Sequence, residues 1–246
     1  MKVAIIQARM SSTRLPGKVL LPLNGKPVLG HVVDRVRQAQ YIEKVVVATS
    51  TQSEDGALAS WCEENGIDCY RGSLQDVLAR YYAVARTTGA EHIVRITGDC
   101  PLIDPLIIDA CIVAYEGGRY DYLSNCTTGP RTFPRGLDTE IFSFSALERA
   151  FRESQEAYER EHVTPYLWQN KKNEFQIAPV FTAAESYARP QYRLTLDYPQ
   201  DYELFKHLYT HVPRREGIIF TPDVLAYLDA HPDVAEINAH CEQAAL

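Results

Sequence analysis

Ala4-Ile-Ile-Gln-Ala-Arg-Met-Ser-Ser-Thr-Arg-Leu-Pro-Gly-Lys18 governs the architecture expected of this chain. Val3 to Ile6 are apolar and partly β-branched, and polar residues follow at once, which predicts a buried strand that leads into a binding loop. The loop gathers cationic, hydroxyl and flexible residues, namely Arg9, Arg14, Lys18, Ser11, Ser12, Thr13 and Gly17. So many hydrogen-bond donors suit an oligophosphate, and the glycine lets the backbone approach such a ligand closely.

The same loop has a simpler interpretation as a solvated connection, which is the commoner role of a charged segment. Its spacing also differs from that of a Walker phosphate loop, so that motif lends no support. Its position favours a phosphate site, because the loop follows the first strand of an α/β pattern. Ligands of open α/β sheets bind at the carboxyl ends of the strands.

Bulk composition sets the class of protein. The chain has 246 residues, 46% of them hydrophobic, which is enough for one α/β core and a single domain over residues 1–246. The formal net charge of −7 argues against nucleic acid and anionic membranes as partners, since both attract broad basic surfaces. We find neither a signal-peptide core nor a membrane span and expect a cytoplasmic protein. The six cysteines lack the paired spacing of zinc ligands.

Apolar runs and amphipathic segments alternate along the first half of the chain, which predicts a Rossmann-like, mostly parallel α/β sheet. Further strands are expected at 44–48, 67–71 and 92–96, with helices at 27–41, 53–65, 74–88 and 105–115. After Gly118 the pattern changes. Strands expected at 120–125, 140–144 and 175–181 predict a small β-rich insertion at about 120–188, and a last core strand is expected at 192–197.

Two aspartates stand at the ends of expected core strands. Asp99 follows the strand at 92–96, where a carboxylate is well placed to hold a divalent cation against phosphate oxygens. An aspartate beside glycine is more often part of a turn. Asp197 ends the strand at 192–197 and, by position alone, would cap the helix that follows.

The segment 127–138 is long, polar and irregular, and such loops within a domain are usually functional or disordered. Arg131 and Arg135 are suited to grip a sugar carboxylate or phosphate, and Asp138 or Glu140 to accept hydrogen bonds from sugar hydroxyls. A solvated excursion is an equally open interpretation of each of these residues.

Several motifs resemble those of the sugar nucleotidyltransferases that make CMP-activated sugars. Within that group the chain is most similar to the SpsF-like spore coat polysaccharide branch, which is grouped with the acylneuraminate and 3-deoxy-manno-octulosonate cytidylyltransferases. The resemblance spans nearly the whole chain. It is carried by residues 9–18 and 21–29, Arg71-Gly-Ser-Leu-Gln-Asp76, Thr97-Gly-Asp-Cys-Pro-Leu-Ile103, residues 130–140, Glu159-Arg-Glu-His-Val-Thr-Pro165 and Arg193-Leu-Thr-Leu-Asp197.

This resemblance implies the nucleotide-diphospho-sugar transferase fold and attack of a sugar hydroxyl on the α-phosphorus of CTP. It implies an Mg²⁺ ion held by Asp99 and Asp197, catalytic roles for Arg9, Lys18 and Asp99, and a homodimer formed through the insertion. We expect loss of Lys18 to weaken CTP binding and leave stability nearly unchanged. The residues implied to bind the nucleotide are Ala8, Arg9, Ser11, Ser12, Arg14 and Lys18, with Arg71, Gly72, Ser73 and Asp76 facing the pyrimidine.

Asp76 has a second explanation, because an acid in the first turn of a helix is favoured by the helix dipole alone. Two other functions also stay open. A glycosyltransferase that uses a preformed nucleotide sugar would share the fold and the metal acid but would not need the loop from Arg9 to Lys18. A non-catalytic nucleotide-binding module would keep the loop and tolerate loss of one acid.

Overall fold

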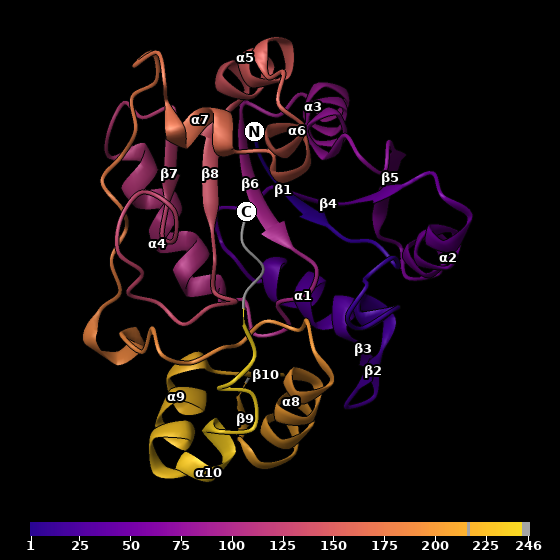
Figure 1. Ribbon diagram of the computed structural model, residues 1–246, viewed down its shortest axis with the longest axis vertical. Coiled ribbons are helices and arrows are strands. Elements are labelled where there is room, and N and C mark those ends of the chain that lie inside the picture. Colours follow the sequence, from indigo (N-terminus) through magenta and orange to yellow (C-terminus); the bar gives the residue numbers. More distant parts are fainter. Residues whose placement is uncertain (216, 243–246) are drawn as a thin grey trace.

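A six-stranded sheet forms the centre of the computed structural model, which describes residues 1–215 and 217–242 (Figure 1). The remaining residues of the expected single domain, 216 and 243–246, lie outside the described part. Neighbouring strands follow the order β5-β4-β1-β6-β8-β7. The first four run parallel, whereas β8 is antiparallel to both β6 and β7. The predicted mostly parallel sheet is confirmed, with strands β1 (Lys2–Gln7), β4 (Lys44–Ser50), β5 (Asp68–Gly72), β6 (His92–Thr97), β7 (Tyr122–Ser124) and β8 (Glu140–Ser143).

The central strand β1 is buried on both sides. Its side chains alternate between the two faces of the sheet, so Val3 and Ile5 join one hydrophobic core while Ala4 and Ile6 join the other. All four are fully buried. This burial explains why the strand reads as an uninterrupted apolar run.

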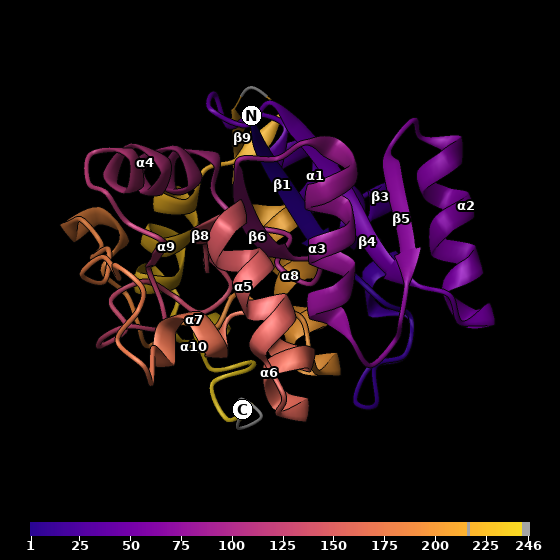
Figure 2. The same cartoon turned by 90° about the horizontal axis from the view of Figure 1, so that it is seen from above.

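Helices cover both faces of the sheet (Figure 2). The core that contains Ala4 lies under helices from the first half of the chain, and the core that contains Val3 lies under α3 and the later helices. The first group comprises α1 (Val28–Val36), α2 (Gly56–Glu64) and α4 (Pro105–Glu116), and the second comprises α3 (Val77–Thr88), α5 (Phe144–Glu153), α6 (Ala157–His162) and α7 (Pro165–Gln169).

A third hydrophobic cluster holds the C-terminal helices together beyond the carboxyl ends of the parallel strands (Figure 1). Leu194 and Leu196 belong to it, so the segment that carries Asp197 is anchored there. The buried Arg35 of α1 donates to the carbonyls of Ile103 and Ile219 and ties this unit to the sheet layer. The helices are α8 (Pro199–His211), α9 (Thr221–Ala230) and α10 (Pro232–Ala235), with the short hairpins β2 (Pro22–Leu23)/β3 (Lys26–Pro27) and β9 (Arg214–Arg215)/β10 (Ile218–Ile219) nearby.

The insertion at 120–188 differs from the β-rich prediction. Its strands β7 and β8 exist but belong to the central sheet, and α5, α6 and α7 follow them. The segment 175–181 forms no strand within the described residues. It lies along β7, bridges Tyr122 at Ile177, and donates from the N–H groups of Ala178 and Phe181 to the carbonyls of Tyr122 and Ser124, both at 2.9 Å. Apolar periodicity does not distinguish a strand from an extended segment that packs on a sheet edge.

The expected core strand at 192–197 is likewise an extended segment outside the described sheet. It makes one bridge, between Arg135 and Arg193, and the N–H of Leu196 donates to the carbonyl of Asp99 at 2.8 Å. The segment also passes very close to the backbone of Gly136. A glycine is required there, because its φ is 101° and a Cβ would lie 1.9 Å from the carbonyl oxygen of Leu194. The segment is buried by a loop and by α8 instead of by neighbouring strands.

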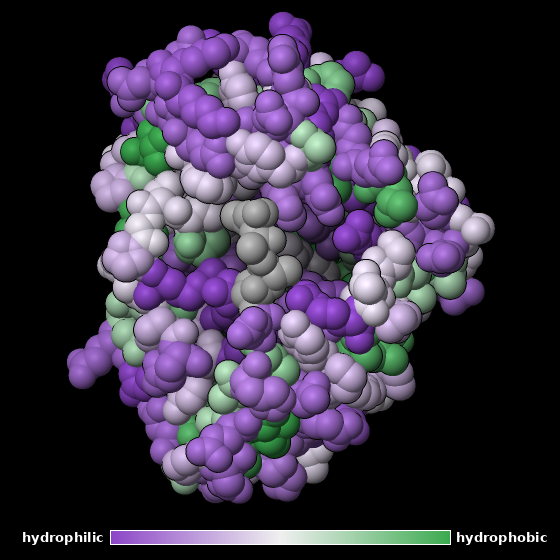
Figure 3. Space-filling view, in the orientation of Figure 1, coloured by the Kyte–Doolittle hydropathy of each residue, from purple (hydrophilic) through white to green (hydrophobic). Residues whose placement is uncertain are grey.

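The lengths of the helices and the polarity of the surface agree with the expectation of no membrane span. No helix in 1–215 and 217–242 is both long and apolar enough to cross a bilayer. The face shown in Figure 3 is mainly hydrophilic, with its hydrophobic residues in small, scattered patches.

Candidate active site

Two adjoining cavities open at the carboxyl end of the parallel strands. The first, of about 490 Å³, is bordered by the loop after β1, the end of β6 and α3. The second, of about 690 Å³, is bordered by the end of β6, the segment 126–140 and α7. Four residues line both cavities, namely Thr97, Asp99, His162 and Asp197. We call these four the junction residues, because the two cavities meet at them.

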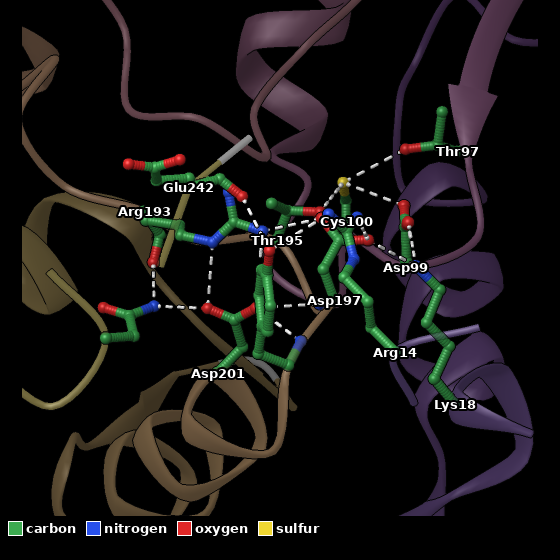
Figure 4. Close-up of polar contacts among 12 residues, drawn as sticks. Arg14, Lys18, Thr97, Asp99, Cys100, Arg193, Thr195, Asp197, Asp201 and Glu242 are labelled. Carbon is green, nitrogen blue, oxygen red and sulfur yellow. Dashed lines mark hydrogen bonds and ion pairs between the residues drawn. The ribbon is translucent and has the colours of Figure 1, made fainter. Parts of the chain in front are cut away.

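Lys18 lies beside the junction (Figure 4). Its ammonium nitrogen donates to Asp99 Oδ2 at 2.6 Å and to Asp197 Oδ1 at 2.8 Å. Asp99 follows β6 and Asp197 precedes α8, so segments far apart in the sequence converge on one nitrogen atom. The three side chains are 11%, 22% and 10% exposed, respectively. Lys18 is therefore a largely buried counter-ion of the two acids as well as a residue of the cavity wall.

Lys18 and Asp99 hold each other in their ionised forms. Burial acts to lower the pKa of Lys18, but the carboxylates of Asp99 and Asp197 outweigh it and the pKa is raised. Burial acts to raise the pKa of Asp99, but the Lys18 ammonium outweighs it and the pKa is lowered. The neighbouring Cys100 has a pKa well above its usual value because of burial and the Asp99 charge. Cys100 is thus a neutral thiol and not an activated nucleophile.

Asp197 is fixed by two arginines in addition to the lysine. Arg193 Nη2 lies 2.6 Å from Asp197 Oδ2, and Arg14 Nη2 lies 3.2 Å from Asp197 Oδ1. The N-cap of α8 is Tyr198, and Asp201 in the first turn accepts from the backbone N–H groups of residues 197 and 198. Asp197 is therefore not the helix cap that its position suggested, and its side chain faces the cavities.

The two carboxylates are of a kind and arrangement that would suit a magnesium ion. Oxygens of Asp99 and Asp197 bond to the same nitrogen atom, so they converge on one point, as two ligands of a single cation must. Mg²⁺ is commonly held by one or two carboxylates together with waters and substrate phosphates. Within the described residues no group of three or more His, Cys, Asp or Glu side chains is placed to hold a metal, so water and nucleotide would complete the shell.

The loop from β1 to Lys18 forms one wall of the first cavity, where the sequence predicted a nucleotide site. Its shape depends on Asp55, which accepts from the N–H of Met10 at 2.6 Å, and on Gly17, whose φ is 69°. Arg9 is 45% exposed, and its one side-chain partner among the described residues is Glu161 at 3.9 Å, which leaves it available to an anion. The predicted residues in this wall are Ala8, Arg9, Ser11, Ser12, Arg14 and Lys18.

The residues expected to face the pyrimidine are not among the described residues that line this cavity. The guanidinium of Arg71 donates to two backbone carbonyls of the loop 50–52, at 3.0 and 2.8 Å. Asp76 is the N-cap of α3 and accepts from the N–H of Ala79 at 2.8 Å, so it stabilises the start of the helix as a cap and not from within the first turn. Base recognition by Arg71, Gly72, Ser73 and Asp76 stays a prediction.

Arg80 lines the first cavity and was not singled out from the sequence. It is 3% exposed, Nη1 donates to the carbonyl of Ala48 at 3.3 Å, and Nε has no hydrogen-bond partner among the described residues. A buried cationic donor without a partner is unfavourable, and a ligand oxygen would satisfy it. The sequence did contain a hint of its burial. Arg80 lies three residues after Val77 and four before Val84, a spacing that places it on the buried face of α3.

The second cavity contains the four residues predicted for the acceptor. Arg131 makes two hydrogen bonds to Asp138, and Glu140 pairs with the half-buried Arg95 of β6. Among the described residues no hydrogen bond or ion pair engages the side chain of Arg135. Burial and the neighbouring Arg131 lower the pKa of Arg135. The structure thus brings these predicted residues together, and Arg135 is the one whose charge is uncompensated.

A mostly parallel α/β sheet with paired carboxylates at its carboxyl edge, where two cavities meet, is the nucleotide-diphospho-sugar transferase type of fold. Solved nucleotidyltransferases share this fold.

The chain belongs to the cytidylyltransferase family, whose model matches residues 3–221. It is 37% identical to the spore coat polysaccharide biosynthesis protein SpsF of Bacillus subtilis, over 94% of this chain and 95% of that protein. A solved cytidylyltransferase from Leptospira borgpetersenii is 34% identical, with a TM-score of 0.86 and coverage of 100% and 99%. A 3-deoxy-manno-octulosonate cytidylyltransferase of Geobacter sulfurreducens is 40% identical over 44% of this chain and 43% of that protein. The resemblance inferred from the motifs is confirmed, and the family implies an enzyme that uses CTP.

Proposed function

We propose that the protein transfers the cytidylyl group of CTP to a hydroxyl of an acidic sugar, giving a CMP-sugar and pyrophosphate for surface or spore coat polysaccharide synthesis. The observation that carries the proposal is the meeting of two cavities at Asp99 and Asp197. A glycosyltransferase would not need the cationic loop at 9–18, and a non-catalytic module would not need two acids aimed at one point. The cytidylyltransferase family also favours the synthetic reaction.

The first cavity is proposed to hold CTP. Arg9, Arg14 and Lys18 would neutralise the triphosphate, and Arg80 would donate to the nucleoside from the cavity wall. Transfer at phosphorus depends mainly on positioning and charge neutralisation, which this wall of fixed cations provides. Asp99 and Asp197 would hold Mg²⁺, which when bound stabilises negative charge on the phosphate oxygens and orients the attacking hydroxyl.

The second cavity is proposed to hold the sugar, and its charges favour an acidic one. Arg131 and Arg95 are each neutralised by a carboxylate, so Arg135 supplies the uncompensated positive charge. A guanidinium binds a carboxylate through two parallel hydrogen bonds. The relative from Geobacter sulfurreducens is named for an acidic sugar, 3-deoxy-manno-octulosonate, which supports this choice.

Pyrophosphate release tests the proposal directly. The protein is incubated with each of the four NTPs, Mg²⁺ and a panel of acidic and neutral sugars. We expect release with CTP and an acidic sugar, and none when Mg²⁺ is chelated. Release that is equal with neutral sugars would contradict the acidic acceptor, and no release with CTP and any acidic sugar of the panel would overturn the proposal.

Arg135→Lys tests the acceptor half separately. Lysine keeps the charge and loses the two-pronged hydrogen bonding, so we expect the acceptor KM to rise roughly tenfold, since hydrogen bonds to charged groups contribute about 1.5–3 kcal/mol. CTP affinity should stay unchanged. Arg152→Lys is the matched control, because Arg152 lies on α5 with 67% exposure. An unchanged acceptor KM would remove Arg135 from the site.

We further propose a cytoplasmic homodimer that pairs through residues 120–188. Light scattering of the purified protein checks the mass against the 27.8 kDa of one chain. A monomeric mass at working concentration would refute the dimer.

A further inference from the structure

His162 is the one imidazole among the four junction residues, and the proposed function assigns it no task. The other three already have partners: both carboxylates bond to Lys18, and the Thr97 hydroxyl lies 3.1 Å from the sulfur of Cys100. No side-chain hydrogen bond or ion pair to His162 occurs among the residues that the structure describes. Its imidazole therefore has both nitrogens available at the boundary between the two cavities.

The backbone next to His162 is strained. Val163 has φ 72° and ψ −54°, a conformation that β-branched residues almost never adopt. The N–H of Thr164 donates to the carbonyl of His162 at 2.9 Å, which closes a γ-turn of the rare form with positive φ. This turn lets Val163 enter the core fully buried while His162 and Thr164 on either side both line the second cavity. Strain of this kind persists where the surrounding structure enforces it, and it is concentrated at functional sites.

The charged groups that act on His162 come from three elements. They are Glu161 of α6, Arg95 of β6 and Arg9 of the loop after β1. Burial lowers the pKa of His162 below its ordinary value, Glu161 opposes this shift, and the two arginines add to it. The imidazole is therefore neutral near pH 7, and one of its nitrogens carries a lone pair that accepts a hydrogen bond.

We infer that His162 accepts the proton of the sugar hydroxyl as that oxygen attacks the α-phosphorus of the nucleotide. The inference rests on the proposed function and adds the residue that removes the proton. It follows from three observations: the position at the junction, the free imidazole and the strained turn that holds it there. The oxygens of Asp99 and Asp197 are less suited to the task because they are already bonded to cations.

The step balances as a simple substitution at phosphorus. The bond between the sugar oxygen and the α-phosphorus forms, and the bond between the α-phosphorus and the oxygen that bridges to the β-phosphorus breaks. The electrons of the sugar O–H bond stay on the sugar oxygen, and the proton passes to the imidazole nitrogen. Pyrophosphate leaves with the electrons of the broken bond.

Kinetics of His162→Gln and His162→Ala test the inference with the acceptor identified by pyrophosphate release. We expect kcat to fall roughly 10²–10⁴-fold, the usual contribution of a general base, with CTP affinity by calorimetry nearly unchanged. Added imidazole should partly restore His162→Ala. We expect kcat of the wild type to fall at low pH as His162 becomes protonated, and this fall should be absent from both variants. His211→Gln is the control, because His211 is exposed on α8 and lines neither cavity.

A loss of kcat below about tenfold would overturn the inference, since general bases contribute more than this. A larger loss that imidazole does not restore and that leaves the pH profile unchanged would assign His162 a structural role and overturn it equally.

A second measurement needs no acceptor. Diethyl pyrocarbonate acylates accessible, unprotonated imidazoles, and mass spectrometry reads the extent of modification at each histidine. Bound CTP should slow modification of His162 and leave that of His211 unchanged. If CTP protects His162 but no sugar reacts, the proposed acceptor is overturned and the position of His162 beside the nucleotide is retained. Unprotected His162 with CTP bound, as verified by calorimetry, overturns the present inference alone, and absence of CTP binding overturns both.

Discussion

Lys18→Met is expected to destabilise the ligand-free protein as well as weaken CTP binding. Methionine keeps the length of the side chain and removes its charge. In the wild type the ammonium bonds to Asp99 at 2.6 Å and to Asp197 at 2.8 Å. After the substitution Asp99 has no cationic partner among the described residues, whereas Asp197 keeps Arg14 and Arg193.

The size of the effect follows from the burial of the cluster. Breaking a buried ion pair by removing one partner costs about 3–5 kcal/mol. The side chain of Asp99 is 22% exposed and Asp197 keeps two cations, so we expect a smaller loss, about 2–3 kcal/mol. For a chain of this size the thermal midpoint falls by about 2–4 °C per kcal/mol, which gives roughly 4–12 °C. This replaces the expectation from the sequence that loss of Lys18 leaves stability nearly unchanged.

Differential scanning calorimetry of the ligand-free proteins measures the change. The matched control is Lys26→Met, because the Lys26–Asp34 pair is exposed, at 47% and 44%, and such pairs contribute about 0–1 kcal/mol. Added Mg²⁺ should raise the midpoint of Lys18→Met more than that of the wild type, since the metal would replace the missing cation between the carboxylates. A midpoint of Lys18→Met equal to that of Lys26→Met would refute the idea that Lys18 is a buried counter-ion.

Three further substitutions or conditions probe the same site. Asp99→Asn should abolish Mg²⁺-dependent turnover without unfolding the protein. If the variant keeps wild-type rates across a magnesium titration, Asp99 serves only in a turn. Arg80→Met should weaken CTP binding by about 1.5–3 kcal/mol, the contribution of hydrogen bonds to charged groups, and calorimetry with unaltered affinity would exclude it from the site. The folded-state pKa of Asp99 is lowered, so its stabilisation is present above its unfolded pKa of about 3.9 and is lost as the pH falls through the folded value. The wild-type midpoint should therefore fall more steeply in acid than that of Asp99→Asn, and parallel curves would contradict this.

The alternation of apolar runs and amphipathic segments was sufficient to predict the order of strands and helices in the first half of the chain. It was also sufficient to place the loop up to Lys18 after the first strand. The strand before Ala8 is buried on both faces, so its apolar run is uninterrupted and readable without neighbours. The loop up to Lys18 and the acid Asp99 follow directly from the ends of β1 and β6, and parallel strands bring those ends to one edge. Arg131 and Arg135, which we propose for the acceptor, stood out in the sequence because a long polar loop within a domain is usually functional or disordered.

Contacts between segments far apart in the chain required the folded protein. Asp197 reaches Lys18 because an extended segment packs on Gly136 and α8, and a period of two in the sequence describes such a segment and a core strand equally well. Arg80 looks like one polar residue in an amphipathic helix until α3 is seen to border the cavity. His162 acquires its position from the strained turn at Val163. Periodicity reports which side of an element is buried, whereas the partner of a side chain depends on how distant elements dock against one another.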